Sequence, residues 1–344
     1  MYDEIVEKML GLMDDKSAAA VYPKFSGEGY KAHRIGVENF HEINSSSNDD
    51  KIAFVDGGNA EIISAANLSL SLVRVGYSIY RSNKKISAKR FEIFAFTQAL
   101  SQNNEIYYKT SFFSTGNSIE LEEISFSSFD NTLMHGVNRA EIGGVANAIR
   151  RFAELKLAKI VAEKKIAGMI VLDGNLQATI TNENNYLSGL YESCMKNNII
   201  LTALSKTTSL FADDGSLLSV VLGNMGAFPI WFYHPVAEIN NQSHKAEMFF
   251  VKFHEKSKHI FRFEIFKNQK IKAEEAISEL ACSCIDPIFI GYPYGLVEAD
   301  RIARISNNEK ESLKTMFLVK LRNKNIEKYL SSVNAHEILD KISF

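Results

Sequence analysis

The stretch MIVLDGNLQATITNENNYLSGLYESCMKNNIILTALSK, residues 169–206, carries the clearest fold signal in the chain. Its two ends, residues 169–172 and 199–204, are continuous apolar runs, and about residues 186–196 between them have helical spacing. Two wholly apolar strands joined by a helix are typical of parallel strands that are buried on both faces of a sheet. The stretch therefore predicts a βαβ unit within an α/β domain.

Upstream of this unit, the sequence predicts an antiparallel meander. The apolar run IAFV, residues 52–55, is expected to form a short strand that stops at Asp56-Gly57-Gly58. Segments in which apolar and polar residues alternate follow it with short links, as in antiparallel strands. The strands predicted from this alternation lie at residues 68–72, 91–96 and 106–113.

Helical spacing and a further hairpin complete the predicted elements. Apolar residues recur with a helical period over residues 142–161, which predicts a helix of roughly six turns. Residues 248–253 and 259–266 alternate around a polar turn and predict a β-hairpin. Later helices are expected at about residues 273–283 and 296–305.

Together these elements predict a single α/β domain over residues 1–344, with a mixed β-sheet and flanking helices. Its core is expected at about residues 50–306, after a helical lead-in over residues 1–40 and before a helical tail over residues 307–344. The hydrophobic fraction of 46% and the charged fraction of 23% are typical of a globular protein.

Composition limits the classes of function. The net charge is −2, so a site for a polyanion must be built from local charge or from metal ions. Three cysteines cannot form a disulfide framework, which fits a reducing compartment. The N-terminus lacks the basic and apolar regions of a signal peptide, and residues 215–233 are too polar to span a membrane. We therefore expect a cytoplasmic protein without a membrane partner.

Charged residues follow three apolar strands and indicate a candidate site. Asp56 and Asp173 each precede glycine, and Lys206 follows the strand next to that of Asp173. In open α/β sheets the ligand crevice lies beyond the carboxyl ends of the strands, so these side chains are expected to converge. Two carboxylates that converge favour a bound cation. The alternative is that each Asp-Gly pair simply forms a tight turn.

The segment GYPYGLVEAD, residues 291–300, is a second candidate. Tyr292 could position a phosphate or a water, and Asp300, on the helix that follows, could reach the strand-end acids. The alternative is an ordinary turn with buried tyrosines. The motifs of P-loop ATPases, serine hydrolases and zincin proteases do not occur in the sequence.

Four motifs together resemble the NurA nucleases in order and approximate spacing, over roughly residues 50–306. The motifs are IAFVDGG (residues 52–58), IVLDGNL (170–176), ALSKT (203–207) and GYPYGLVEA (291–299). The resemblance implies an RNase H-like core and Mn²⁺-dependent cleavage of DNA, with 5′→3′ exonuclease and single-strand endonuclease activity. It also implies a homodimer that works with a HerA-type hexameric ATPase in DNA end resection and double-strand-break repair.

The resemblance also assigns roles to individual residues. Asp56 and Asp173 match the metal-binding aspartates of the family, Lys206 matches its Ser-Lys lysine, and Tyr292 matches its Tyr-Pro tyrosine. Asp300 stands where the family usually has histidine, and is expected to complete the metal shell. Asn175 stands where the family usually has serine.

The family also has a glutamate on the helix before the second aspartate strand. Glu154 is the best match, and Glu141 and Glu163 remain open alternatives. The expected mechanism is phosphodiester hydrolysis with two Mn²⁺ or Mg²⁺ ions held by Asp56, Glu154, Asp173 and Asp300, while Lys206 neutralises the scissile phosphate.

Local cations and the N-terminal helix are expected to bind the partners. Ile5, Met9 and Leu12 recur about one turn apart and could dock the ATPase. Two other functions stay open, a non-catalytic DNA-binding or ATPase-docking subunit and a phosphoesterase for small substrates. Candidate contacts to the DNA backbone are Lys84, Lys85, Lys89, Arg90, Lys252 and Arg262.

Overall fold

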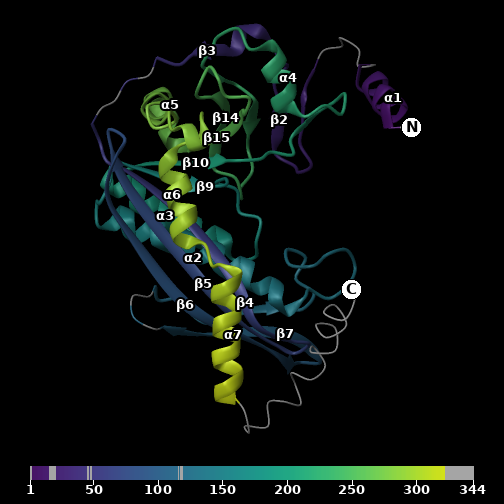
Figure 1. Cartoon of the computed structure of the whole chain (residues 1–344), viewed down its shortest axis with the longest axis vertical. Coiled ribbons are helices and arrows are strands. Elements are labelled where there is room, and N and C mark those ends of the chain that lie inside the picture. Colours follow the sequence, from purple (N-terminus) through teal and green to yellow (C-terminus); the bar gives the residue numbers. More distant parts are fainter. Residues whose placement is uncertain are drawn as a thin grey trace.

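The predicted βαβ unit lies at the centre of the molecule (Figure 1). It consists of β9 (Met169–Asp173), α3 (Glu183–Asn197) and β10 (Ile200–Ser205). β9 pairs in parallel with β10 on one side and with β4 (Ile52–Ala65) on the other. The computed structural model describes residues 2–14, 21–44, 46, 49–114, 116 and 119–321.

The antiparallel meander is confirmed, and its strands are longer than the sequence analysis predicted. After β4 come β5 (Leu68–Arg81), β6 (Lys84–Gln102), β7 (Glu105–Ser114) and β8 (Ile124–Ser127). Two-residue turns at Ser82-Asn83 and Asn103-Asn104 join β5 to β6 and β6 to β7. Both residues of each turn have positive φ, which suits the twist of tight hairpins and is tolerated best by asparagine.

The prediction that the first strand stops at Asp56 is wrong, because β4 continues to Ala65. β5 pairs with β4 from Ile52 to Ala65, whereas β9 pairs only with Ile52–Val55. Gly57 and Gly58 therefore lie within a strand, and no turn forms there. What ends before Asp56 is the pairing with β9.

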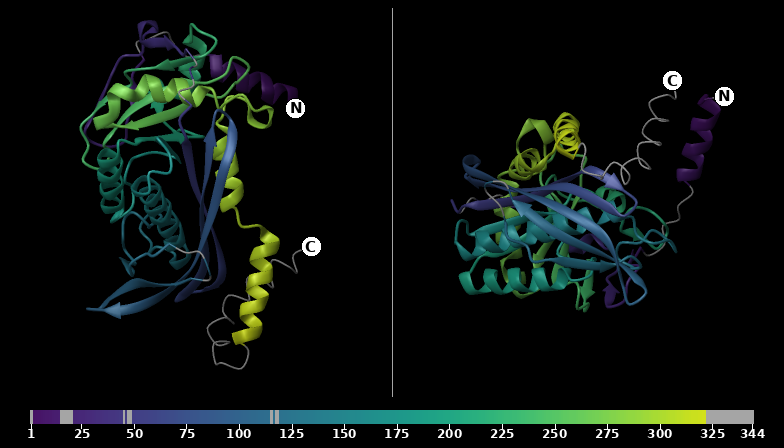
Figure 2. Two further views of the ribbon diagram at one scale, coloured as in Figure 1. Left: turned by 90° about the vertical axis from the view of Figure 1, so that its left-hand side faces the viewer. Right: turned by 90° about the horizontal axis from the view of Figure 1, so that it is seen from below.

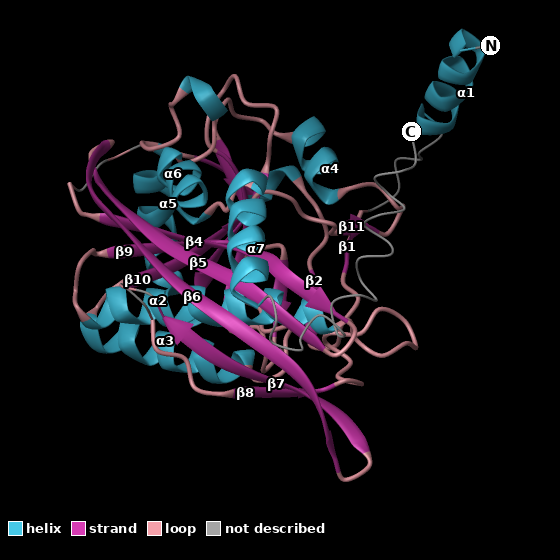
Figure 3. Ribbon diagram, turned by 60° about the horizontal axis from the view of Figure 1, so that its bottom comes forward, coloured by secondary structure: helices cyan, strands magenta, loops and turns pink. Residues whose placement is uncertain are grey.

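The central strands have the spatial order β6-β5-β4-β9-β10, with the first three antiparallel and the last three parallel. This is the arrangement of an RNase H-like core, as expected. One face packs against α2 (Val145–Glu163) and α3, and the other against α5 (Ala273–Ala281) and α6 (Tyr294–Ala303) (Figures 1 and 3). The two faces carry separate clusters of buried apolar side chains, so the sheet is covered on both sides.

The predicted hairpin of β14 (Ala246–Lys252) and β15 (Phe261–Phe266) extends the sheet beside β10. β12 (Trp231–Tyr233) and β3 (Phe40–Glu42) lie beyond it. Within the described part of the chain, the whole sheet has eleven strands. α4 (Leu218–Met225) precedes β12, and no described helix is long and apolar enough to cross a membrane.

Among the described residues, the predicted helical lead-in over residues 1–40 is correct only for α1 (Tyr2–Asp14) and a short 3₁₀ turn. Residues 21–42 instead form β1 (Pro23–Lys24), β2 (Tyr30–Ala32) and β3. Aromatic and branched side chains of this segment pack with the β12 and β14 residues in a third apolar cluster. Tertiary burial of these side chains therefore outweighs any local helical preference.

Helix α7 (Asn307–Leu321) runs beside the long strands of the meander (Figure 2). Leu313 and Phe317 pack against Leu72 of β5 and Phe94 of β6. The rest of the predicted helical tail, residues 322–344, lies outside the described residues. Helix α1 stands apart from the body of the molecule in Figures 1 and 2.

Candidate active site

Strand register brings Asp56 and Asp173 together. The last paired residues of β4 and β9 are Val55 and Leu172, so these two aspartates are the next residues on neighbouring parallel strands. Residues at matching positions of adjacent strands point to the same face of the sheet. Asp56 is buried, with 6% of its surface exposed, and β9 ends at Asp173. The expected convergence of the two acids therefore follows from parallel pairing.

Lys206 joins these acids from the end of β10. Its Nζ donates to Asp173 Oδ2 at 2.6 Å and lies 5.7 Å from the ring centroid of Tyr292. The Tyr292 hydroxyl is in turn 3.5 Å from Asp173 Oδ1. Four residues that the sequence analysis proposed, Asp56, Asp173, Lys206 and Tyr292, are thus gathered in one place.

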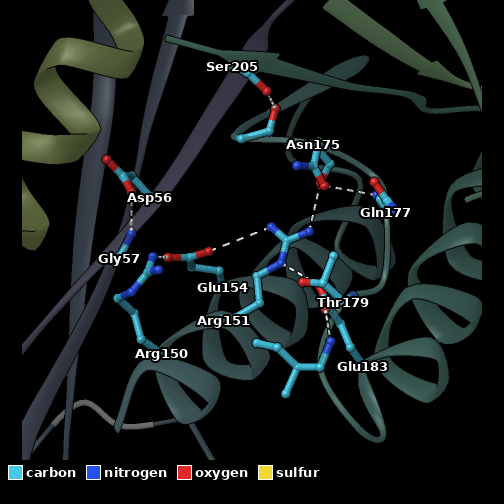
Figure 4. Close-up of polar contacts among 12 residues, drawn as sticks. Asp56, Gly57, Arg150, Arg151, Glu154, Asn175, Gln177, Thr179, Glu183 and Ser205 are labelled. Carbon is cyan, nitrogen blue, oxygen red and sulfur yellow. Dashed lines mark hydrogen bonds and ion pairs between the residues drawn. The ribbon is translucent and has the colours of Figure 1, made fainter. Parts of the chain in front are cut away.

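Glu154, alone among the three candidate glutamates, reaches this centre. Its side chain is buried, and its Oε1 occupies the space beside Gly57, where a Cβ would lie only 2.6 Å away. Figure 4 shows the Glu154 carboxylate between Arg150 and Arg151, close to the strand that carries Asp56. Glycine at position 57 therefore leaves room for the carboxylate of Glu154.

The other two candidates lie elsewhere. Glu163 is exposed near the end of α2, where its carboxylate is 3.7 Å from Lys159 Nζ. Glu141 is exposed and precedes the 3₁₀ turn before α2.

The carboxylates of the site repel one another. Burial, followed by the nearby carboxylates of Asp173 and Glu154, raises the pKa of Asp56 to about 8. Burial also raises the pKa of Glu154, although Arg150 and Arg151 oppose this shift. Burial alone would lower the pKa of Lys206, but its ion pair with Asp173 raises it. Arg150, Arg151 and Lys206 pair with Glu154 and Asp173. Among the described residues the buried Asp56 has no ion pair, so its carboxyl group favours a proton or a further cation.

Asp300 lies at the rim of this centre. Its Oδ2 accepts a hydrogen bond from Arg304 Nη2 at 3.0 Å, and its Oδ1 is 4.0 Å from Lys206 Nζ. Its side chain is 39% exposed, more than the 20% of Asp173. The residue is thus near the proposed ligands but more open to solvent than they are.

Glycines allow α6, which carries Asp300, to pack closely on β4. A Cβ at Gly58 would lie 2.5 Å from the carbonyl oxygen of Ala303, and a Cβ at Gly295 would lie 2.1 Å from the ring of Phe54. The Asp56-Gly57-Gly58 motif thus allows neighbouring groups to approach β4 closely. It does not form the tight turn that was considered as an alternative. Gly174 has a φ of +108°, so the second Asp-Gly motif does change the direction of the chain.

The donor set fits a hard divalent cation by its chemistry. Asp56, Glu154 and Asp173 offer carboxylate oxygens, the ligands preferred by Mg²⁺ and well accepted by Mn²⁺. Among the described residues, however, no three His, Cys, Asp or Glu side chains are already arranged to hold a metal ion. Arginine and lysine side chains pair with Glu154 and Asp173 instead.

Two grooves flank the segment that follows Lys206. The first, about 740 Å³, is lined by Lys206, Lys252, Lys256 and Lys258 among others, and we call it the lysine groove. The second, about 710 Å³, is lined by residues from β2, β15 and the loop before β2, and by Ser205 and Asn175. We call it the aromatic groove because Phe25, Tyr30 and Phe211 form part of its wall.

The structure divides the predicted DNA contacts into two groups. Lys252 lines the lysine groove and Arg262 lines the aromatic groove. Lys84 and Lys85 instead begin β6, and Lys85 pairs with the buried Glu298 of α6. Lys89 also lies on β6, as does Arg90, which is 3.3 Å from Glu92.

Sequence reasoning missed several residues around the site. Arg150 and Arg151 precede Glu154 by one helical turn, a spacing that predicts ion pairs on one helix face. Lys256 and Lys258 are visible in the sequence as a basic hairpin turn, but nothing local places them beside Lys206. The aromatic residues before β3 form no local pattern that predicts a functional role, because only tertiary packing brings them close to the end of β10.

The strand order and the carboxylate centre define an RNase H-like domain with acidic residues where its central strands end or separate. The chain belongs to the NurA family, whose domain matches residues 50–305.

A solved structure of a family member agrees with this fold. The chain is similar to the NurA nuclease from Sulfolobus solfataricus, with 15% identity, a TM-score of 0.51, and coverage of 84% of this chain and 89% of that chain. It also matches the catalytic domain of human endonuclease V, with 10% identity, a TM-score of 0.36, and coverage of 80% of this chain and 92% of that chain. No curated protein matches the sequence.

Proposed function

We propose that this NurA-family protein is a metal-dependent DNA nuclease that hydrolyses phosphodiester bonds. The observation that carries the proposal is the meeting of three carboxyl groups, Asp56, Glu154 and Asp173, beside Lys206. Burial and repulsion by the other two carboxylates raise the pKa of Asp56 to about 8, so its charged form is disfavoured without a cation beside it. A bound divalent cation would stabilise that charge.

Asp56, Glu154 and Asp173 would hold the metal, with Asp300 at the rim as a fourth ligand. We favour two Mn²⁺ ions, in keeping with the family, and keep Mg²⁺ as the other candidate, because all four residues offer oxygen donors that both ions accept. Bound ions of this kind supply Lewis-acid activation of water and charge stabilisation at the leaving oxygen.

The remaining groups would act on the substrate directly. The ammonium group of Lys206 is paired with Asp173, and it would neutralise the scissile phosphate when Asp173 serves as a metal ligand. Burial, with the nearby Asp173 and Asp56, raises the pKa of Tyr292, so its hydroxyl stays protonated and can donate a hydrogen bond.

The surroundings of the centre favour a polymeric substrate. The lysine groove is lined by Lys206, Lys252, Lys256 and Lys258, which suits a phosphate backbone. A net charge of −2 is compatible with DNA binding if the cations are concentrated there. We propose 5′→3′ exonuclease and single-strand endonuclease activity, in keeping with the family.

We further propose that the protein acts in the cytoplasm as a homodimer, together with a HerA-type hexameric ATPase in DNA end resection. The sequence has no P-loop motif, so a motor would have to act in trans. Helix α1 exposes Ile5 and Met9, as expected of a docking helix, while the side chain of Leu12 lies outside the described residues. Loss of ATPase binding after deletion of residues 1–16 would support this role, and unchanged binding would contradict it.

Cleavage assays with end-labelled DNA test the proposed activity. Single- and double-stranded substrates labelled at the 5′ or 3′ end would be incubated with the protein and Mn²⁺, Mg²⁺ or EDTA. We expect cleavage with Mn²⁺ and none with EDTA. DNA binding without cleavage under any metal would favour the non-catalytic alternative, and cleavage of nucleotides but not DNA would favour the small-substrate phosphoesterase.

A further inference from the structure

The aromatic groove opens directly beside the proposed catalytic centre. Ser205, which lines it, immediately precedes Lys206, and Asn175, on the same wall, is two residues after Asp173. Ser205 Oγ donates to the carbonyl oxygen of Gly174 at 2.7 Å, so the two strand ends are tied together at this wall (Figure 4). A ligand in the groove would therefore lie next to a phosphate held by Lys206.

The groove is also lined by stacked aromatic rings. Phe25 and Tyr30 stack with their ring centroids 4.5 Å apart and an interplanar angle of 3°. Both side chains are only partly buried, and Phe211 beside them is 46% exposed. Partly open, parallel rings of this kind are the surfaces on which unpaired bases stack.

A buried polar network holds this aromatic pair in place. The Tyr30 hydroxyl is 2.9 Å from His244 Nδ1, and His244 Nε2 is 3.0 Å from Glu264 Oε1. Glu264 is fully buried and also accepts hydrogen bonds from the Leu176 amide at 2.8 Å and from Arg262 Nε at 2.6 Å. The network thus links the aromatic wall to the loop after Asp173, which fixes the groove relative to the catalytic centre.

Arg262 brings a guanidinium group to the same groove. Its Nε donates to Glu264 Oε1 at 2.6 Å, and its Nη2 is in ion-pair contact with the same carboxylate. The buried carboxylate therefore holds the guanidinium in place at the wall of the groove. An aromatic surface with an arginine beside it suits a nucleobase.

We propose that the aromatic groove binds an unpaired base of single-stranded DNA, stacked on Phe25, next to the bond that is cut. The proposal rests on the proposed nuclease function for its substrate. A duplex cannot place a base in this groove without unpairing it, whereas a single strand can do so at little cost. Phe25 and Tyr30 lie outside residues 50–305, so this wall is added by the segment before the family domain.

Binding without metal separates this inference from catalysis. Fluorescence anisotropy in EDTA would compare a short labelled oligothymidine with an abasic deoxyribose-phosphate oligomer of the same length. We expect wild-type protein to bind the oligothymidine about tenfold more tightly, since stacking of one base contributes that order of affinity. Phe25→Ala and Phe25→Leu should remove most of this difference, and Phe25→Trp should retain it.

Matched controls make either outcome decisive. Phe113→Ala removes an exposed aromatic from β7, which four strands separate from β10 in the sheet, and should leave both affinities unchanged. Phe25→Leu keeps the apolar volume without the flat ring, and its thermal midpoint would confirm folding. If folded Phe25→Leu still prefers the oligothymidine as wild type does, the inference is overturned. If Asp56→Asn abolishes cleavage but keeps the preference, base binding stands whatever becomes of catalysis.

Discussion

Lys206 Nζ lies 2.6 Å from Asp173 Oδ2, so a side-chain cation occupies one of the oxygens that we assign to a metal. Burial of the ammonium group is compensated by this pair, which raises the pKa of Lys206 above its usual value. A metal ion held by Asp173, as we propose, would therefore compete with Lys206 for the same carboxylate. This competition distinguishes a lysine that acts on the substrate from one that merely stabilises the fold.

Lys206→Met should have opposite effects on metal binding and on cleavage. Without the competing ammonium group, the affinity for Mn²⁺ should rise several-fold in a calorimetric titration. The rate of DNA cleavage should nevertheless fall, by about a hundredfold, because the scissile phosphate loses its neutralising charge. Lys252→Met, in the lysine groove, is the control and should leave Mn²⁺ affinity unchanged. Weaker Mn²⁺ binding by Lys206→Met would contradict the competition.

Asp56→Asn should stabilise the metal-free protein, and increasingly so as the pH rises. The pKa of Asp56 is about 8 in the folded state and about 3.9 in an unfolded chain, so the folded state binds the proton more tightly. Between these two pH values, the free energy of unfolding of the wild type falls as the pH rises. This group contributes at most about 1.4 kcal/mol of that fall per pH unit. Asparagine does not titrate, so the variant lacks this contribution. Thermal midpoints in EDTA from about pH 4 to about pH 8 would measure the difference. A constant difference across this range would contradict the raised pKa of Asp56.

Glu154→Gln should lower Mn²⁺-dependent cleavage by about a hundredfold or more, since an amide cannot supply the charge of a ligand carboxylate. Glu163→Gln is the matched control, because Glu163 lies on the same helix but pairs with Lys159 at the surface. Its cleavage rate should equal that of the wild type. Equal losses in both variants, or loss only in Glu163→Gln, would show that Glu154 is not the helix ligand.

Asp300→Ala should lose most activity with either metal, whereas Asp300→His should retain activity with Mn²⁺ and lose it with Mg²⁺. Histidine nitrogen is a softer ligand that Mn²⁺ accepts more readily than Mg²⁺. Arg304→Ala removes the hydrogen-bond partner of Asp300 and controls for changes in the helix end. Wild-type rates for Asp300→Ala would remove this residue from the metal site.

Local sequence patterns predicted those parts of the site that depend on strand order. Apolar runs before Asp173 and Lys206 predicted a parallel pair, and the structure places both residues at its end. The extent of β4 was not predictable, because its continuation past Asp56 depends on pairing with β5 and not on its own residues. Likewise, the strands in residues 21–42 form only because distant apolar residues bury them. The choice of Glu154 among three glutamates depended on the space beside Gly57.

Single-turnover cleavage of labelled single-stranded DNA by wild type and Asp173→Asn, with Mn²⁺ or with EDTA, tests the central claim most directly. Asp173 is paired with β10 in the sheet, accepts a hydrogen bond from Lys206 and contacts the hydroxyl of Tyr292. The proposed chemistry therefore depends on its charge. We predict Mn²⁺-dependent cleavage by the wild type and none by the folded Asp173→Asn variant. Asp213→Asn, in a surface turn, should cleave as the wild type does. Cleavage by Asp173→Asn at the wild-type rate would contradict the assignment of this centre as the active site.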